Sequence, residues 1–349
     1  MSPRQTQDYQ ALTNKIHEEV KRLIALEDVK YIIGWGSGSY GLRVSPVFVE
    51  TENEINTLIW SPFCINNLSV YPTLEEKLPL PRGVAEDTRR IGVIVKGCDS
   101  RGIVQILIEN GFPREQLVIL GIPCTGQIDI DKLLPILIEK GISEDIHLRD
   151  IEVADLDDKF GFKIKTNDEV NEFEIPKLEV IYEKCATCRY PNPIISDILL
   201  SAPVEARGNE GEGYARVNEL ESMVVDDRWK FWAEKFDRCI RCYACRNVCP
   251  VCYCKECLAD KWEPDWIRKS TNLTENTMFH ITRAFHLVGR CISCYECERA
   301  CPVGIPLLDL YKELEKEVSE QFNYEAGTDP EIKPLLSTFN PDDPGEFIL

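Results

Sequence analysis

The chain has 349 residues, 44% of them hydrophobic, so it can hold two domains and bury a sizeable core in at least one of them. Its formal net charge of −19 argues against nucleic acid or an anionic membrane surface as a partner, because both would repel it. The sequence has no secretory signal and no run of about 18 apolar residues, so no transmembrane segment and a cytoplasmic location are expected. In a reducing cytoplasm, sixteen cysteines indicate metal ligation rather than disulfides.

Residues 1–200 alternate short apolar runs with helical patterns, which predicts an α/β domain with a largely parallel sheet. The expected strands are YIIGW (31–35), INTLIW (55–60), RIGVIVK (90–96), QLVILGI (116–122) and LEVIYEK (178–184). Between them, Asp99 is expected to cap a helix with the sequence RGIVQILIEN, and Gly111 is expected to end it.

A glycine-rich stretch, GWGSGSYG, follows the first expected strand and contains Gly34, Gly36, Gly38 and Gly41. Glycines at these positions could let a phosphate or FAD approach the backbone closely. The next segment, LRVSPVFVE, has the pattern of a second strand, so a hairpin turn is the alternative that we favour.

The composition changes after residue 200. Residues 201–222 are rich in Gly and Glu and are expected to form a linker. Residues 223–322 carry helical patterns that lead into cysteine motifs, which predicts a mainly α-helical domain. Residues 323–349 are acidic and interrupted by prolines, and we expect an extended tail that docks on a partner or folds back over this domain.

A repeat defines the chemistry of the helical domain. The segments CIRCYACRNVCP and CISCYECERACP share the pattern CxxCxxCxxxCP, which is typical of bacterial ferredoxins with two [4Fe–4S] clusters. Three closely spaced thiolates wrap one cluster, and the fourth cysteine, before the proline, points to the other cluster. The predicted ligand sets are Cys239, Cys242, Cys245 with Cys301, and Cys291, Cys294, Cys297 with Cys249. Zinc is the alternative, although zinc sites normally come as paired CxxC motifs.

About forty residues separate the two motifs, and they have a helical pattern. This arrangement resembles the α-helical dicluster ferredoxin module of succinate dehydrogenase iron–sulfur subunits and of the small subunit of heterodisulfide reductases. His280 and His286 lie in the connecting segment. Packing or hydrogen bonding near a cluster is the expected role of both, because each predicted cluster already has four thiols.

Eight further cysteines lie outside the two predicted ligand sets. Cys64, Cys98, Cys124 and Cys185 each follow an expected strand, and the carboxyl ends of parallel strands lie along one edge of a sheet. We therefore predict a third cluster from Cys98, Cys124, Cys185 and Cys188, with buried free thiols as the alternative. Three more thiols, Cys252, Cys254 and Cys257, could hold a fourth cluster, for which Cys64 is the one unassigned fourth ligand.

The segments KGCDSRG, GIPCTGQID and EKCATCRYPNPIISDIL resemble the beta subunits of deazaflavin (coenzyme F420) hydrogenases and formate dehydrogenases. The resemblance covers about residues 30–200 and implies a cluster and FAD in one α/β domain, although this domain is short for that family. Together with the dicluster module, the chain looks like the iron–sulfur subunits of heterodisulfide-reductase-type flavin complexes in anaerobes.

Two functions follow from these patterns. In the first, the chain is a non-catalytic subunit that relays single electrons between partners: a flavoprotein, a heterodisulfide-reductase-like subunit, a hydrogenase or a formate dehydrogenase. In the second, it is an FAD enzyme that takes hydride from a deazaflavin or nicotinamide and passes electrons to its clusters. The relay is the interpretation we favour, because every strong motif binds clusters and none clearly binds a two-electron cofactor.

Overall fold

The computed structural model describes residues 6–77, 82–83, 85, 87–166, 169–209 and 211–337. Contacts divide the chain into two compact units, each built from more than one segment. Unit 1 comprises Met1–Leu68, Ala85–Ser100 and Arg114–Glu210. Unit 2 comprises Ser69–Val84, Arg101–Pro113 and Gly211–Leu349. Two segments of the first 200 residues therefore group with the C-terminal part of the chain.

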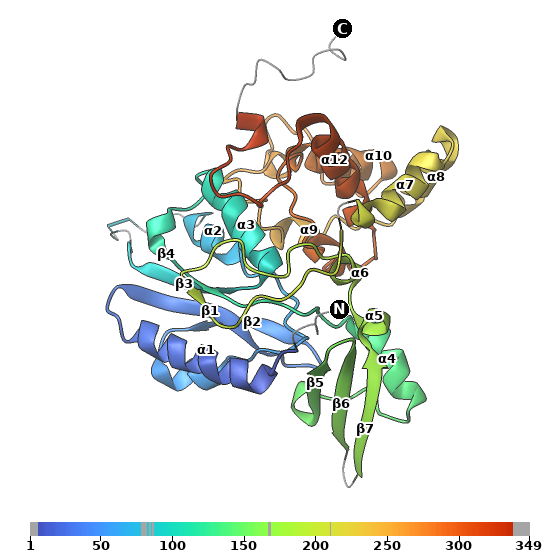
Figure 1. Ribbon diagram of the computed structural model, residues 1–349. Helices are drawn as coiled ribbons and strands as arrows, with labels where there is room; N and C mark the ends of the chain where they lie inside the picture. The colour runs from blue at the N-terminus through green and yellow to red at the C-terminus, as the bar shows by residue number, and fades with distance from the viewer. Residues whose placement is uncertain are drawn as a thin grey trace. The chain divides into compact units, whose positions relative to one another are not determined.

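Unit 1 is built on a mostly parallel five-stranded sheet with the order β2-β1-β3-β4-β8 (Figure 1). Only β1 and β2 pair antiparallel, and the other neighbours are parallel. The strands are β1 (Val29–Ser37), β2 (Val44–Val49), β3 (Arg90–Val95), β4 (Leu117–Gly121) and β8 (Ile198–Leu199). Every residue of β4 is buried, as expected for a strand covered on both faces. The α/β domain predicted from the sequence is confirmed at this level.

Helix α1 (Tyr9–Ile24) packs against β1, and Asp8 caps its N-terminus by accepting from the backbone N–H of Ala11. A second, antiparallel sheet, which the sequence analysis missed, consists of β5 (Ile151–Leu156), β6 (Lys159–Thr166) and β7 (Glu169–Pro176). The remaining helical segments of unit 1 are η1 (Glu52–Thr57), η2 (Arg114–Gln116), α4 (Ile130–Glu139), η3 (Leu148–Asp150), α5 (Lys177–Val180) and α6 (Glu183–Ala186).

Two of the expected strands are wrong. INTLIW contributes to the 3-10 helix η1, and only Leu58 makes an isolated bridge, to Gly36. LEVIYEK forms the short helices α5 and α6, with an isolated bridge between Ile128 and Ile181. Short apolar runs are ambiguous because a buried loop or a single helical turn requires the same side chains as a strand.

Helix α3 (Gly97–Ile108) begins one residue after β3 and two residues before Asp99, its expected cap. Asp99 lies inside its first turn, and its carboxylate accepts from the backbone N–H groups of Lys96 and Leu68. Asp99 is therefore not the cap that the sequence predicted. At the other end, Asn110 takes the left-handed conformation (φ 55°), and Gly111 follows it.

Unit 2 is mainly helical. Its largest core cluster includes Phe236, Phe279, Leu307, Tyr311 and several of the motif cysteines. Its helices are α2 (Val70–Lys77), η4 (Glu212–Tyr214), α7 (Ala215–Ser222), α8 (Val225–Asp237), α9 (Ala244–Asn247), η5 (Leu258–Asp260), α10 (Leu273–His286), α11 (Glu296–Arg299), α12 (Leu307–Phe322) and η6 (Leu335–Ser337). In the described part of the chain, no helix combines the length and the apolar character needed to cross a membrane.

The boundaries of the helical part differ from the expected ones at both ends. Residues 215–222, assigned to the linker, form α7, because Val217 and Leu220 lie one turn apart and are buried. In the tail, Tyr324 and Ala326 are buried in a second core cluster with Ile292, Cys294 and Val318. Residues 323–337 thus fold back within unit 2, while residues 338–349 lie outside the described residues.

Candidate iron–sulfur centres

The two cysteine repeats have the same local structure. The third cysteine of each, Cys245 and Cys297, lies on a single helical turn, α9 or α11. Ahead of each turn, two residues at matching positions adopt positive φ. They are Arg241 (56°) and Tyr243 (59°) in the first repeat and Ser293 (53°) and Tyr295 (71°) in the second. These left-handed residues curl the backbone so that the thiols of one repeat gather around a common point.

The two repeats contribute to two small cavities in a crossed pattern. One cavity is lined by three cysteines of the first repeat and the last cysteine of the second: Cys239, Cys242, Cys245 and Cys301. The other is lined by three cysteines of the second repeat and the last of the first: Cys291, Cys294, Cys297 and Cys249. These groups coincide with the two ligand sets that the spacing predicts.

The spread of the thiols fits a cluster better than a single ion. In a tetrahedral zinc site with Zn–S bonds near 2.3 Å, the sulfur atoms lie about 3.8 Å apart. Among the described residues, the one group of three or more possible ligands with all ligand atoms within 4.8 Å is Glu221, Glu313 and Glu317. The cysteine sets are therefore wider than one zinc ion would require, whereas four thiolates are the donors that a [4Fe–4S] cluster takes.

Positive groups and a neutral imidazole surround these cavities. Arg283 is 5% exposed and donates to the carbonyl of Cys245 (2.9 Å) and to the hydroxyl of Tyr311. The imidazole Nε2 of His280 lies 3.3 Å from the Sγ of Cys239. Burial, together with the positive charges of Arg283 and Arg241, lowers the pKa of His280 to about 3, so the ring is neutral. Burial likewise raises the pKa of Cys245 to about 11, so an iron centre is needed to keep that sulfur as a thiolate.

Four cysteines of unit 1 also come together. Cys98 is the second residue of α3, shortly after β3, and Cys124 follows β4. Cys185 lies on α6 and Cys188 follows it. Burial raises the pKa of Cys188 to about 12, and Cys185, Cys98 and Cys124 act in the same direction through their negative charge. The Cys188 thiol is thus close to the other three, as the third predicted set requires. Cys185 reaches the set from a helical turn rather than from the expected strand end.

Backbone packing holds this set of four. The N–H of Cys124 donates to the carbonyl of Pro191 (2.9 Å), and the carbonyl of Cys188 accepts from Gly208 (3.0 Å). A Cβ atom at Gly97 would lie 1.8 Å from the carbonyl oxygen of Tyr190, so this approach requires glycine next to Cys98.

Cys64 is buried beside this set, with its Sγ 3.7 Å from the hydroxyl of Ser61 and 3.8 Å from the carbonyl of Ile59. It belongs to unit 1, whereas Cys252, Cys254 and Cys257 belong to unit 2 and line a cavity there. Beside Cys64 lies a buried ion pair, in which Lys96 Nζ is 2.9 Å from the carboxylate of Asp99 and 4.5 Å from the ring centroid of Trp35.

The glycine-rich stretch forms the end of the β1–β2 hairpin. The N–H of Gly38 donates to the carbonyl of Arg43 (2.8 Å), and Ser37 pairs with Val44. The space beside Gly34 is taken by the side chains of Leu58 and Ile94, and Gly41 has φ 58°. The hairpin turn and the close packing of neighbouring side chains are sufficient to explain why glycine occupies these positions, without a bound phosphate or FAD.

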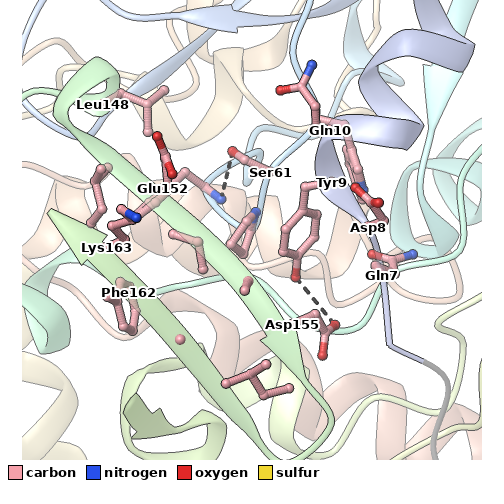
Figure 2. Close-up of a pocket in the computed structure, with 18 of the residues that line it drawn as sticks. Gln7, Asp8, Tyr9, Gln10, Ser61, Leu148, Glu152, Asp155, Phe162 and Lys163 are labelled. Carbon is pink, nitrogen blue, oxygen red and sulfur yellow. Dashed lines mark hydrogen bonds between the residues drawn. The ribbon is translucent and has the colours of Figure 1, made fainter. Parts of the chain in front are cut away.

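A large cavity of unit 1, about 1170 Å³ in volume, was not predicted from the sequence. Figure 2 shows Tyr9 and Asp155 facing each other at this cavity, with Gln7 beside them. The hydroxyl of Tyr9 donates to the carboxylate of Asp155 (3.5 Å). Thr125 donates to the same carboxylate (2.6 Å), and Gln7 donates to the carbonyl of Pro123. The cavity therefore borders the segment that carries Cys124.

The residues that the sequence analysis missed are those whose role depends on distant neighbours. Arg283 lies in a segment whose helical pattern predicts an exposed position, and Asp155 lies in a strand that was not expected. The one available signal for Arg283 was its place at i+3 from His280 on the helix that leads into the second motif.

The fold and the cavities define an α/β unit with a converging cysteine set, joined to a helical unit of the dicluster ferredoxin type. Residues 88–219 match the C-terminal domain of the beta subunits of coenzyme F420 hydrogenase/dehydrogenase, and residues 235–305 match the 4Fe-4S dicluster domain. The chain is 25% identical over 345 residues to the F420-dependent formate dehydrogenase subunit beta of Methanocaldococcus jannaschii, covering 84% of this chain and 86% of that protein. It is 23% identical over 295 residues to the F420-dependent formate dehydrogenase 1 subunit beta of Methanococcus maripaludis, covering 71% and 75% of the two chains.

A solved structure of the F420-reducing [NiFe] hydrogenase complex from Methanosarcina barkeri, derivatised with xenon, matches with 14% identity and a TM-score of 0.38. The match covers 54% of this chain and 64% of that one. The chain is homologous to the beta subunits of F420-dependent formate dehydrogenases, and it combines their type of C-terminal domain with a 4Fe-4S dicluster domain. The resemblance inferred from the cysteine segments is confirmed.

Proposed function

We propose that this chain relays single electrons through [4Fe–4S] clusters between partner subunits of an oxidoreductase complex. The observation that carries the proposal is the crossed lining of the two cavities of unit 2, where each set of four thiols draws on both repeats. Because each cluster would share its ligand segments with the other, the two centres would be close neighbours, as one-electron transfer requires.

The third centre would extend this relay into unit 1. Cys98, Cys124, Cys185 and Cys188 supply four thiols to one region, which matches the donor set of a further cluster. Lys184 acts on the thiols of Cys98 and Cys185 through its positive charge and would offset part of the charge of a bound cluster.

The partners follow from the relatives, which are named as subunits of F420-dependent formate dehydrogenases. A catalytic dehydrogenase or hydrogenase subunit would lie at one end of the relay. A flavoprotein or a heterodisulfide-reductase-like subunit would lie at the other. The complex would work in an anaerobic cytoplasm, since clusters of this type are sensitive to oxygen.

The test is anaerobic purification of the chain from its native host, with iron and sulfide analysis, electron paramagnetic resonance and identification of associated subunits. The proposal expects at least eight irons per chain, two interacting reduced clusters and a copurifying redox subunit. A chain that carries zinc in place of iron, or shows no reducible centre, contradicts it.

A second candidate function is supported by the cavity of unit 1. Its volume, about 1170 Å³, is sufficient for a dinucleotide, since sites for small molecules span about 300–1000 Å³. Trp60, Phe63 and Phe162 line it and could stack on a ring system, and Arg149 could pair with a phosphate. An FAD bound there would lie near Cys124, so the chain would accept hydride and pass single electrons to the clusters.

Flavin analysis of the purified chain separates the two functions. Tightly bound FAD, together with reduction of an artificial acceptor by a deazaflavin at about 1–1000 per second without partners, would establish the flavoenzyme. Phe162→Ala, which removes a ring at the cavity, should then lower the flavin content while the iron content stays unchanged. Absence of flavin and of turnover leaves the electron relay.

A further inference from the structure

Three cysteines that neither repeat uses line one cavity of unit 2, about 340 Å³ in volume. Cys252, Cys254 and Cys257 follow the first repeat closely, in the pattern CxCxxC. The same cavity is lined by His286, the last residue of α10. His286 is exposed, and no hydrogen bond joins its imidazole to another described side chain, so its ring nitrogens are open to water or to a ligand.

Positive charge is concentrated around this cavity. Arg246, Arg283, Arg290 and Lys255 line it, against a single carboxylate, that of Asp260. In a chain with a net charge of −19, such a collection of cations indicates an anionic occupant.

The three arginines differ in how their charge is balanced. Arg246 is paired with Asp260 (2.7 Å) and Arg290 with Glu109 (2.6 Å). Arg283 lines both this cavity and the cavity of the second repeat, and its buried Nε has no hydrogen-bond partner among the described residues. A buried guanidinium is costly unless negative charge lies close to it, and a negative centre in this cavity would add to the compensation that the repeat thiolates give Arg283.

We propose that Cys252, Cys254, Cys257 and His286 hold a further [4Fe–4S] cluster, in which the imidazole ligates the fourth iron. The inference rests on the proposed electron relay and extends it. The four residues line the same cavity, about 340 Å³ in volume, and thiolates and imidazole are both ligands that iron takes. The cluster does not need Cys64, whose thiol is enclosed by Ser61 and Ile59 in unit 1.

The position and the ligands of this cluster give it a definite role. The side chain of Cys252 is hydrogen-bonded to that of Cys249, which lines the cavity of the second repeat, so an electron has a short path between the two centres. A neutral imidazole in place of a thiolate makes the cluster one charge less negative, and the surrounding cations favour its reduction. The cluster would therefore be the most easily reduced centre of unit 2. It would accept one electron from a repeat cluster, which is oxidised in the same step.

The first experiment is iron analysis and electron paramagnetic resonance on the full chain, purified anaerobically. The double variant Cys254→Ser, Cys257→Ser should lose about four irons per chain and one reduced signal, while the signals of the two repeat clusters persist. Cys64→Ser is the matched control and should keep that iron. An unchanged iron content in the double variant, or zinc at this site, overturns the proposal. If the unaltered chain showed no electron paramagnetic resonance signals from the two repeat clusters, that result would instead contradict the electron relay.

The second experiment addresses the imidazole. In protein labelled with ¹⁵N-histidine, the cluster of highest potential should show a strong nitrogen hyperfine coupling that His286→Ala removes. His286→Cys should keep the iron and shift the potential of this cluster to a more negative value. Phe285→Ala changes a neighbouring exposed side chain outside the cavity lining and should have no effect. A strong coupling that survives in His286→Ala, or a potential unchanged in His286→Cys, contradicts ligation by His286.

Discussion

The imidazole of His280 lies 3.3 Å from the Sγ of Cys239 and stacks on the ring of Phe236, with centroids 4.9 Å apart. Because the ring is neutral, one of its nitrogens carries a hydrogen, and a hydrogen on Nε2 would be donated to the sulfur. Such a bond stabilises the more negative, reduced state of a cluster bound to Cys239.

His280→Leu should therefore lower the reduction potential of the cluster held by the first repeat. One hydrogen bond contributes about 1 kcal/mol, and a one-electron couple changes by about 59 mV for each tenfold change in its equilibrium constant, so we expect a shift of about −40 mV. A redox titration followed by electron paramagnetic resonance measures it. The cluster of the second repeat is the internal control, and an equal shift of both clusters would indicate a general structural change instead.

The crossed ligand sets predict an unusual consequence of Cys249→Ser. Although Cys249 belongs to the first repeat, its loss should damage the cluster bound by Cys291, Cys294 and Cys297. Cys242→Ser is the matched variant and should damage the other cluster. Signals of the two reduced clusters are compared in both proteins. If Cys249→Ser altered only the first-repeat cluster, the crossed assignment would be wrong.

The cysteine set of unit 1 is best tested in the full chain, because residues 69–84 and 101–113 group with unit 2 and a fragment of residues 1–200 would leave them without their partners. The double variant Cys185→Ser, Cys188→Ser should lose about four irons per chain. Iron analysis should find no loss in Cys64→Ser. Equal iron in the double variant and the unaltered chain would leave these residues as structural thiols.

The buried ion pair of Lys96 and Asp99 should be important for folding. Asp99→Asn leaves the ammonium group of Lys96 buried without its counter-charge, which costs about 3 kcal/mol or more. The expected result is a lower urea midpoint, measured anaerobically by tryptophan fluorescence. Asp87→Asn breaks the exposed pair with Arg89 and should cost less than about 1 kcal/mol. Similar midpoints for the two variants would contradict the importance of burial.

Two truncations of the tail, residues 323–349, can test whether the tail supports the second-repeat cluster. Truncation after Ser337 keeps Tyr324 and Ala326 in the core cluster that includes Cys294, so the iron content should be unchanged. Truncation after Phe322 removes both side chains and the carbonyl of Ala326, to which Arg101 donates (2.7 Å), so the second-repeat cluster should be lost in part. Iron analysis and thermal unfolding of the two truncations test this. Full iron content in the shorter protein would show that the tail does not support the cluster.

The parts of the molecule that the sequence predicted well are those in which the chemistry is local. The two repeats could be recognised in the sequence because three ligands of each cluster follow each other at fixed short spacings. Cys185 and Cys188 lie in the region of Cys98 and Cys124 although LEVIYEK is not a strand, because the buried Ile181 and Tyr182 lead there between two short helices. The antiparallel β5–β7 sheet was missed because its strands carry many charged residues on an exposed face.

Other features depend on contacts between distant residues and could not be predicted. The grouping of residues 69–84 with unit 2, and the convergence of His286 and Cys257 on one cavity, require the folded structure. The place of Arg283 at i+3 from His280 puts it on the same helix face, but it does not show that the charge is buried among thiols.

The four left-handed residues of the repeats, Arg241, Tyr243, Ser293 and Tyr295, have a consequence for how the protein matures. Each costs about 1–2 kcal/mol in this conformation, and bonds between iron and sulfur can compensate that cost. Closing of the loops and binding of iron would then be coupled, and a chain without iron would be cleaved by proteases more readily at these loops. The supply of iron would thus influence how much of the protein survives in the cell.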